Sequence, residues 1–220
     1  MHKTCDVMME KNILDENNRL AEKNSSLLEK HGIRAFNVLG AIGSGKTTII
    51  ETLSEEIENL RVGAIAGDLA GQDDYLRFKS HDIPAVAINT GKDCHLDAHY
   101  VSHALEDLPL DEIDILFIEN VGNLICPVDF PLGTEMSIVV ISVTEGDDMI
   151  RKHPLIFARS EISVINKIDL ADVMDVDINV IETDFRKINP HGKLIKLDAR
   201  KGDGLEELAE SIGVPYSLPL

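Results

Sequence analysis

Residues 40–47 read Gly40-Ala41-Ile42-Gly43-Ser44-Gly45-Lys46-Thr47 and match the pattern G-x-x-x-x-G-K-[ST] at every position. The apolar run 35–39 precedes this stretch, and a helical pattern from Thr48 to about Leu60 follows it. Glycines let the backbone curl its N–H groups toward one anion, and the N-terminus of the following helix adds a positive dipole end. We therefore predict a phosphate-binding loop between a strand and a helix, rather than a chance glycine-rich turn.

The residue types in this loop indicate individual roles. We expect Lys46 to reach the β- and γ-phosphates of a nucleoside triphosphate and the Thr47 hydroxyl to bind Mg²⁺. The residues expected to contact the nucleotide from this segment are Gly40, Gly43, Ser44, Gly45, Lys46, Thr47 and Thr48.

From residue 35 onward, short apolar runs alternate with polar stretches of helical pattern. The runs are nearly continuous and rich in β-branched residues, as in strands buried on both faces, and the stretches between them complete βαβ units. The runs are Ala35–Leu39, Val62–Ala66, Ala85–Ile88, Ile115–Ile118, Ile138–Val143, Ile162–Ile165 and Leu194–Leu197. The sequence therefore predicts an α/β fold of the P-loop NTPase type, with a doubly wound, mostly parallel sheet flanked by helices in one domain, 35–220.

Residues 1–34 form a separate, helical extension in this prediction. A polar helix is expected over 8–31, with leucine, isoleucine and alanine side chains spaced by sevens and with Gly32 as its C-terminal stop. Such a helix either packs on its own domain or binds a partner or a second copy, and two to three heptads do not decide between these interpretations.

The formal net charge of −18 lies entirely outside this extension. Residues 1–34 hold six basic and six acidic side chains, whereas 35–220 hold 15 basic and 33 acidic ones. A body of this charge repels a phosphate backbone, which argues against nonspecific nucleic-acid binding but not against one anion held in a local pocket.

Cysteine content and hydropathy indicate the compartment. The chain has three cysteines, too few for a closed disulfide framework, and no run of the roughly 18–20 apolar residues that span a membrane. The N-terminal residues lack the basic and then apolar layout of a signal peptide. We therefore expect a cytoplasmic protein with no membrane partner.

Carboxylates at the ends of neighbouring strands complete the expected magnesium site. Glu119 follows the run 115–118 and is expected to bind Mg²⁺ through water, while the Gly122 N–H senses the γ-phosphate. Common GTPases carry Asp-x-x-Gly here, so the glutamate changes the coordination distance. Asp68 and Asp74 are both candidates for a further carboxylate near the metal, or else ordinary cap and turn residues.

The tetrapeptide Asn166-Lys167-Ile168-Asp169 follows another apolar run and fits the guanine signature N-K-x-D. A carboxylate at Asp169 accepts from both guanine N1–H and N2–H₂, whereas adenine would leave it unpaired. Lys167 would cover the base and Asn166 would tie neighbouring loops together. The companion Ser-Ala-Lys loop appears here as Asp198-Ala199-Arg200, where we expect the Ala199 N–H to contact guanine O6.

Thiol and imidazole groups indicate a second kind of metal site. In Cys94-His95-Leu96-Asp97-Ala98-His99 the two histidines are four residues apart, which predicts one shared helical face, and Cys126 lies just beyond Gly122. These ligands suit Zn²⁺ or Ni²⁺ better than Mg²⁺ or Ca²⁺. Cys94, His95 and Cys126 are one short of a tetrahedral set, which a site shared across a two-fold axis would complete. Buried free cysteines and surface histidines are the alternative.

Taken together, these motifs resemble those of the hydrogenase nickel-incorporation GTPases, the HypB family. The matching segments are Gly40–Thr47, Ala66–Asp68, Thr90–Ala98, Glu119–Pro127, Thr144–Asp148 and Asn166–Asp169. The resemblance implies GTP hydrolysis, a GTP-favoured homodimer and a metal site at its interface, with Cys94, His95 and Cys126 as ligands of nickel or zinc and His99 as a further one. It also implies that Lys152 reaches the nucleotide of the partner subunit. The chain lacks the N-terminal Cys-x-x-Cys-Gly-Cys motif and the histidine-rich stretch of some family members.

We therefore expect a slow, Mg²⁺-dependent GTPase that couples nucleotide state to nickel transfer during [NiFe] hydrogenase maturation. Its expected partners are a second copy, a maturation accessory protein and the hydrogenase large subunit, and the residues closest to the chemistry are Lys46, Thr47 and Glu119. Two alternatives from other classes are an ATP-dependent kinase or ligase, and a non-enzymatic metal-binding module that GTP or GDP merely stabilises.

Overall fold

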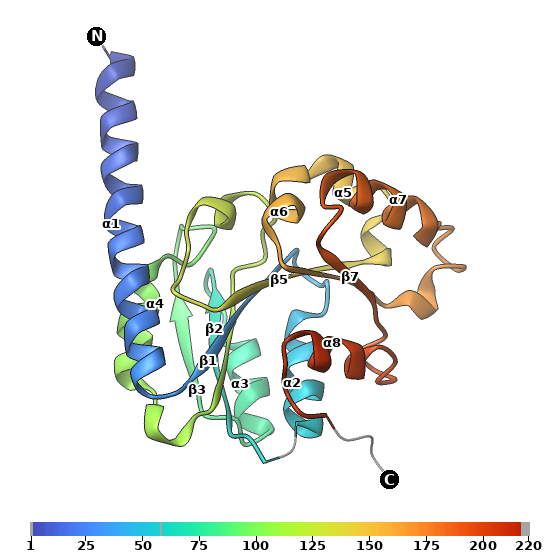
Figure 1. Ribbon diagram of the computed structural model, residues 1–220, viewed down its shortest axis with the longest axis horizontal. Coiled ribbons are helices and arrows are strands. Elements are labelled where there is room, and N and C mark those ends of the chain that lie inside the picture. The colour runs from blue at the N-terminus through green and yellow to red at the C-terminus, as the bar shows by residue number, and fades with distance from the viewer. Residues whose placement is uncertain (1, 58, 217–220) are drawn as a thin grey trace.

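The computed structural model describes residues 2–57 and 59–216, with side chains from Asn12 onward. In this part of the chain, seven parallel strands form one twisted sheet with helices on both of its faces (Figure 1). The strands are β1 (Arg34–Gly40), β2 (Val62–Asp68), β3 (Ala85–Asn89), β4 (Ile115–Glu119), β5 (Met136–Ser142), β6 (Ile162–Asn166) and β7 (Lys193–Lys196). Each predicted apolar run overlaps one strand, and the predicted fold class is confirmed.

The strand order β3-β2-β4-β1-β5-β6-β7 places β1 in the middle of the sheet. β1 pairs with β4 on one side and with β5 on the other, so the chain winds outward from β1 in both directions. A ligand of a doubly wound sheet binds beyond the carboxyl ends of the strands at such a reversal point. The segment 40–47, which directly follows β1, therefore lies at the expected position of a site.

The helices cover the two faces because side chains alternate along each strand. Phe36 and Val38 of β1 pack in one apolar cluster with α2 (Lys46–Glu56), α3 (Asp73–Ser80) and α8 (Leu205–Ser211). Ala35 and Leu39 point the other way. On that face lie α1 (His2–Lys30), α4 (Ala98–Asp107), α5 (Met149–Lys152), α6 (Pro154–Arg159) and α7 (Ile178–Ile188).

Element boundaries differ from the predicted ones by a few residues at several ends. β5 begins at Met136 rather than at residue 138, and α2 ends at Glu56, because Ile57 is already extended. The first helix begins at His2 rather than at residue 8 and ends at Lys30, and Gly32 follows in a left-handed conformation with φ of 69°.

Helix α1 packs on its own domain along its second half. Leu28 belongs to the apolar cluster that includes Leu96, Val101 and Leu105 of the α4 region, and the N-terminal half of α1 projects beyond the body (Figure 1). Of the two interpretations of this helix, the structure shows self-packing from about Asn17 onward.

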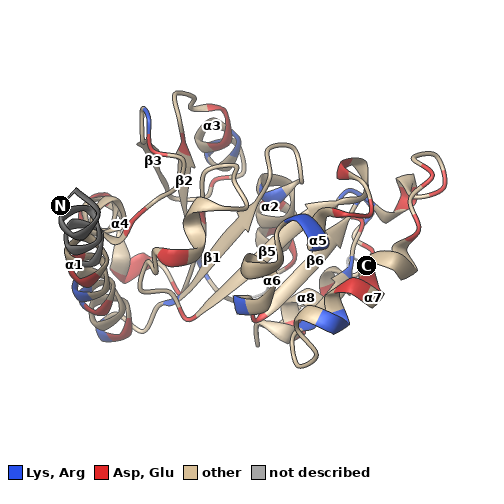
Figure 2. Ribbon diagram, turned by 90° about the horizontal axis from the view of Figure 1, so that it is seen from above, with Lys and Arg blue, Asp and Glu red and all other residues tan. Residues whose placement is uncertain are grey.

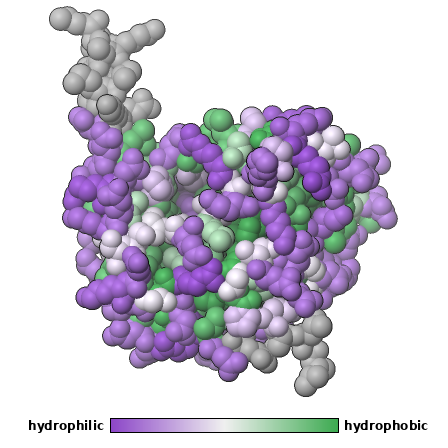
Figure 3. Space-filling model, viewed as in Figure 1, coloured by the Kyte–Doolittle hydropathy of each residue, from purple (hydrophilic) through white to green (hydrophobic). Residues whose placement is uncertain are grey.

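Charged side chains are spread over the outside of this framework. Acidic residues occur on most helices and on the loops around the sheet, and basic residues are fewer (Figure 2). Hydrophilic residues dominate the rim of the face in Figure 3, and apolar residues surface mainly in the hollow at its middle. No described helix is both long enough and apolar enough to cross a membrane.

Gly133 lets the chain pass close beneath α1. Its φ is +93°, and a Cβ at this position would lie 2.4 Å from the carbonyl oxygen of Ala21. We predict that Gly133→Ala lowers the free energy of unfolding by about 3 kcal/mol, through backbone strain and the displacement of α1. Gly202 has a φ of +83° with nothing within 4 Å of the added Cβ, so Gly202→Ala should cost only about 1 kcal/mol. Urea unfolding of both variants measures the difference, and equal costs would show that the contact with α1 contributes nothing.

Candidate functional site

The loop between β1 and α2 adopts the compact turn that its glycines allow. Gly43 and Gly45 have φ values of 79° and 100°, in the region that other residues rarely adopt. A Cβ at Gly40 would lie 2.3 Å from the Val140 carbonyl oxygen, and one at Gly45 would lie 2.2 Å from Nδ2 of Asn166. The glycines therefore serve both the turn and the close approach of β5 and of the 166–169 segment.

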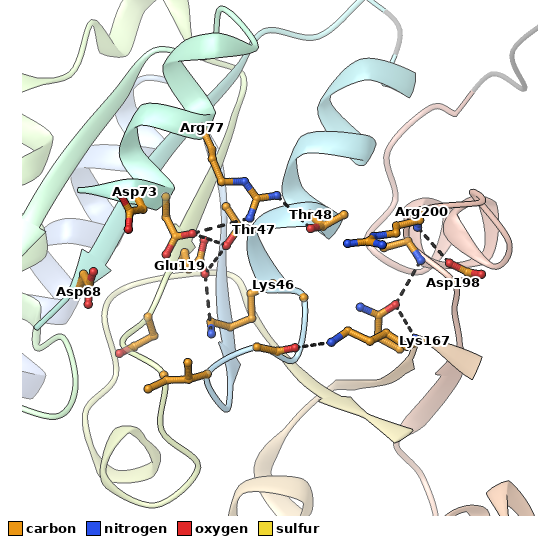
Figure 4. Close-up of a pocket in the computed structure, with 18 of the residues that line it drawn as sticks. Lys46, Thr47, Thr48, Asp68, Asp73, Arg77, Glu119, Lys167, Asp198 and Arg200 are labelled. Atoms are coloured by element: carbon orange, nitrogen blue, oxygen red, sulfur yellow. Dashed lines mark hydrogen bonds and ion pairs between the residues drawn. The ribbon is translucent and has the colours of Figure 1, made fainter. Parts of the chain in front are cut away.

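A cavity of about 570 Å³ opens beside this loop and brings together most of the residues predicted from the sequence. That volume falls within the range of small-molecule sites, roughly 300–1,000 Å³. Its lining includes Ile42, Gly43, Gly45, Lys46, Thr47, Thr48, Gly67, Asp68, Asp73, Asp74, Arg77, Glu119, Asn120, Gly122, Asn166, Lys167, Asp169, Leu170, Asp198, Ala199 and Arg200. Five separate segments contribute these residues, all from the carboxyl edge of the sheet (Figure 4).

Three oxygen-bearing side chains converge at one end of the cavity. The Thr47 hydroxyl donates toward Asp74 Oδ1 at 2.7 Å and lies 3.0 Å from Glu119 Oε1. Glu119 is 3% exposed, and its Oε2 has no hydrogen-bond partner in the described part of the chain. A hydroxyl and two carboxylates, one of which has an unpartnered buried oxygen, form a donor set of the kind that Mg²⁺ binds, so these residues fit the ion.

Burial raises the pKa of Glu119 to about 7, although Lys46 opposes the shift. Lys46 Nζ lies 3.7 Å from Glu119 Oε1 and donates to the carbonyl oxygens of Gly40 and Ala41 at 3.4 and 3.2 Å. The buried carboxylate thus lacks enough positive charge around it to ionise at its ordinary pH. A bound cation would supply that charge.

Of the two aspartates predicted as candidates, Asp74 is the one beside Thr47. Asp68 also lines the cavity, where Figure 4 shows it set apart from Thr47, and its Oδ1 accepts the N–H of Leu69 at 2.6 Å. A magnesium-binding role of Asp68 therefore stays a prediction.

At the opposite end, Asn166 joins two loops. Its Nδ2 donates to the Ser44 carbonyl oxygen at 2.9 Å, and its Oδ1 accepts the N–H groups of Lys167 and Ala199 at 2.8 and 3.2 Å. Lys167, in a left-handed conformation, donates from Nζ to the Gly43 carbonyl oxygen at 2.6 Å. The phosphate loop and both loops of the base end therefore form one hydrogen-bonded unit, with the Ala199 N–H directed to Asn166.

Asp198, which stands in place of the serine of the Ser-Ala-Lys loop, forms hydrogen bonds within the second base loop. Its Oδ1 accepts the N–H groups of Arg200 and Lys201 at 3.1 and 3.3 Å. Lys201 Nζ lies 3.1 Å from Asp198 Oδ2 and 3.3 Å from Asp169 Oδ2, so it holds the two carboxylates of this end together.

The predicted thiol and imidazole ligands form a separate cluster. One ligand atom each of Cys94, His95 and Cys126 lies within 4.8 Å of the others, and all three residues are half-buried. The neighbouring Cys126 thiol raises the pKa of Cys94, and burial lowers the pKa of His95 and so favours a neutral imidazole. A neutral imidazole and two thiols that lose protons on binding are suitable ligands of Zn²⁺ or Ni²⁺.

The prediction that His95 and His99 share a helical face is wrong. Asp97 caps α4 by accepting the N–H of Tyr100 at 2.9 Å, so the helix begins at Ala98 and His95 lies in the preceding loop. His99 is exposed, and its ring packs edge-on against His103 with centroids 4.6 Å apart. His99 therefore lies outside the cluster of Cys94, His95 and Cys126.

Lys152 does not line the cavity of its own chain. It lies at the end of α5, and its Nζ pairs with Asp148 at 2.7 Å. The side chain is 59% exposed.

Sequence reasoning missed several residues of this region. Arg77 of α3 lines the cavity, where it donates to the Thr48 hydroxyl at 3.0 Å and pairs with the buried Glu51 of α2. The spacing Asp73-Asp74-x-x-Arg77 in one short helix was the available signal. Glu145 is a second omission, since burial raises the pKa of this capping carboxyl to about 7.

Comparisons with known proteins agree on one family. Residues 34–196 match the family described as CobW/HypB/UreG, nucleotide-binding domain. The chain is 52% identical to the probable hydrogenase maturation factor HypB of Methanocaldococcus jannaschii over 96% of each chain. The crystal structure of HypB from Archaeoglobus fulgidus superposes with a TM-score of 0.83 at 48% identity, covering 89% of this chain and 96% of that one. HypB from Helicobacter pylori, solved in complex with nickel, gives 0.85 at 32% identity, with 89% and 92% covered.

The raised pKa of Glu119 predicts a pH-dependent cost to stability. The folded-state pKa is about 7 against an ordinary 4.5, so the folded state holds an extra proton between these values and loses stability as pH rises through them. In EDTA without nucleotide, Glu119→Gln should be more stable than the wild type by about 3 kcal/mol at pH 8 and about equal to it near pH 4.5. Urea unfolding at both pH values tests this, with the exposed Glu106→Gln as control. An equal advantage at both pH values would contradict it.

Proposed function

The chain belongs to the HypB family of hydrogenase maturation factors, whose nucleotide-binding domain has the P-loop NTPase fold, and on that premise we propose that it is a GTP-hydrolysing metallochaperone. It would assist nickel insertion into [NiFe] hydrogenase from the cytoplasm, as a GTP-favoured homodimer with a metal site at its interface. Its further partners would be a maturation accessory protein and the hydrogenase large subunit. The names of the relatives support the process, and the nickel complex of the Helicobacter pylori protein supports the cargo.

One segment of the chain carries this proposal, because it belongs to both sites. Glu119 lies beside Thr47 at the phosphate end of the cavity, and Cys126, seven residues later, belongs to the thiol cluster. Gly122, between them, lies so close to the phosphate loop that an added Cβ would be 2.3 Å from Cγ1 of Ile42. A change in the phosphate loop therefore has a short covalent route to a ligand of the cluster.

For hydrolysis, the chain supplies mainly position and charge. Lys46 would exchange the carbonyl oxygens of Gly40 and Ala41 for phosphate oxygens, and Thr47, with Asp74 and Glu119, would hold Mg²⁺. The bound ion would neutralise charge that develops on the phosphates. Among the lining residues, no histidine stands ready as a general base, so turnover should be slow without a partner.

Selection of guanine would rest on the Asp169 carboxylate. Its Oδ2 lies 3.3 Å from Lys201 Nζ, and the guanine N1–H and N2–H₂ would replace or share that contact. Adenine offers no such pair of donors, so it would leave the carboxylate unmatched. Lys167 would cover the base, and the Ala199 N–H would leave Asn166 to contact O6.

The cluster would receive nickel as cargo or zinc in its place. Each chain offers three ligands, and the two-fold axis of a homodimer would bring two such sets together. Lys152 is exposed and lies outside the cavity of its own chain, and its Nζ would exchange the Asp148 carboxylate for the nucleotide of the partner subunit.

Nucleotide competition and phosphate release test the hydrolytic part. We predict that GTP outcompetes ATP at equal concentration by on the order of 10⁴-fold, because the Asp169 site hydrogen-bonds the base. Lys46→Ala should lower phosphate release by roughly 10²–10³-fold through the loss of charge stabilisation. Tighter binding of ATP would favour a kinase or ligase instead. Release that does not depend on Lys46 would favour a metal-binding module that the nucleotide only stabilises.

Two asparagines strengthen the connection between the sites. Asn123 Nδ2 donates to the Cys94 carbonyl oxygen at 3.1 Å, while its backbone bridges to Gly40 at the start of the phosphate loop. Asn120 is 1% exposed, and its Oδ1 accepts the N–H of Leu96 at 2.9 Å. The side chains of Asn120 and Asn123 thus both form hydrogen bonds to the loop that carries Cys94 and His95.

Removal of the hydrogen bond between Asn123 and Cys94 should uncouple the nucleotide cavity from the metal cluster, while each site still binds its own ligand. Coupling is the ratio of nickel affinities with GDP and with a GTP analogue, and it is reciprocal between the two ligands. We predict that Asn123→Ala lowers this ratio toward one, with nucleotide affinity within about threefold of the wild type. Spectroscopic Ni²⁺ titrations in both nucleotide states measure it.

The surface variant Asn179→Ala on α7 is the matched control and should keep the wild-type ratio. Cys126→Ala should remove nickel binding and leave GTP binding in place. A wild-type ratio in Asn123→Ala would show that coupling runs by another route.

A further inference from the structure

Helix α1 contains two asparagines that are almost completely buried. Asn17 is 6% exposed and Asn24 is 2% exposed, and their spacing of seven residues puts them on one face of the helix. Asparagine is unfavourable inside a helix, and its amide is costly to bury without hydrogen bonds. The partners of these two side chains therefore indicate what this face of α1 does.

Both asparagines bind the backbone of one residue, Ala98. Asn17 Oδ1 accepts the Ala98 N–H at 2.8 Å, and Asn24 Nδ2 donates to the Ala98 carbonyl oxygen at 2.8 Å. Ala98 is the first residue of α4, where an N–H group has no partner within its own helix. In addition to the Asp97 cap, α1 thus supplies an acceptor for the first N–H of α4, at the point where the loop with Cys94 and His95 enters the helix.

The same two side chains also bind the second segment of the metal cluster. Asn17 Nδ2 donates to the Pro131 carbonyl oxygen at 2.9 Å, and Asn24 Nδ2 donates to that of Leu132 at 3.1 Å. These residues follow the short 3₁₀ helix Cys126–Asp129, and Gly133 beyond them lies close against the backbone of α1. The two segments that carry the ligands are therefore both hydrogen-bonded to the same two side chains.

A ring contact connects the two segments on the side of the ligands. Phe130, directly before Pro131, packs on the His95 ring with centroids 4.1 Å apart. A movement of 131–132 away from α1 would carry Phe130 off His95, and a movement of Ala98 would shift the loop that holds Cys94. The distances among Cys94, His95 and Cys126 thus depend on the positions of Ala98 and of residues 131–132, which α1 fixes by hydrogen bonds.

We propose that α1 is a brace of the metal cluster and that Asn17 and Asn24 are positioning residues for Cys94, His95 and Cys126. The proposal rests on the proposed metal-binding function and adds a part of the chain that contributes no ligand. It assigns a role to the N-terminal helix within its own subunit, distinct from docking to a partner.

Three alanine variants of the full chain test the brace: Asn17→Ala, Asn24→Ala and, as control, Asn18→Ala, whose exposed side chain makes none of these bonds. Ni²⁺ is titrated into each, with thiolate-to-nickel charge-transfer absorption as the signal. Asn17→Ala and Asn24→Ala should weaken Ni²⁺ binding at least tenfold and shift the absorption band. Asn18→Ala should match the wild type, and GTP affinity should stay within threefold in all three.

Hydrogen exchange of the same variants without metal supplies an independent measurement. Amides in 94–101 and 126–133 should exchange faster in Asn17→Ala and Asn24→Ala, and those in 40–50 should not change. Wild-type Ni²⁺ affinity and exchange in folded Asn17→Ala and Asn24→Ala would overturn the brace, and so would equal loss of GTP binding, which would mark α1 as a general stabiliser. If the wild type binds no Ni²⁺, the proposed function fails, whereas the exchange data still decide whether α1 holds the two segments.

Discussion

The structure depends on a backbone constraint at the end of its central strand. Within eight residues the chain must leave β1, turn its N–H groups inward and enter α2. Along this path its backbone also packs closely on β5 and on the Asn166 side chain. Gly40 and Gly45 leave the space for those two neighbours. Because β1 is flanked by β4 and β5, the segments that follow these strands meet the loop at the same edge of the sheet. The positions of Glu119, Asn166 and Asn123 all follow from this meeting point.

The same edge reconciles a strongly acidic chain with a phosphate ligand. A net charge of −18 repels polyanions at long range, but the field inside a pocket is set by the nearest groups. Here those groups are the loop N–H groups, Lys46 and the N-terminus of α2. The negative group beside them is Glu119, which is almost completely buried and has a pKa of about 7. Burial of its carboxylate is unfavourable when no cation is bound. In a cation site, the favourable free energy of cation binding offsets this loss of folding stability.

How far the sequence predicts this arrangement depends on the range of the interactions. The seven apolar runs, the phosphate loop and the 166–169 segment are local patterns with fixed spacing, so the strands and the cavity lining follow from them. The helical face proposed for His95 and His99 failed because one side chain, Asp97, takes the cap position and starts α4 three residues after His95. Asn17, Asn24, Asn120 and Asn123 gave no signal, since each binds a backbone group distant in sequence, which only the tertiary fold reveals.

These asparagines share a chemistry that suits the junctions they occupy. A carboxamide both donates and accepts, so one side chain can join two backbone segments, as Asn166 joins the Ser44 and Ala199 loops. It carries no charge and does not titrate, so it holds the same bonds across the physiological pH range. The titratable groups Glu119, Cys94 and His95 are left at the places where a cation would bind. The asparagine hydrogen bonds therefore do not depend on pH, whereas the protonation of Glu119, Cys94 and His95 does. Binding of a cation would change the charge of these groups without breaking the asparagine hydrogen bonds that position them.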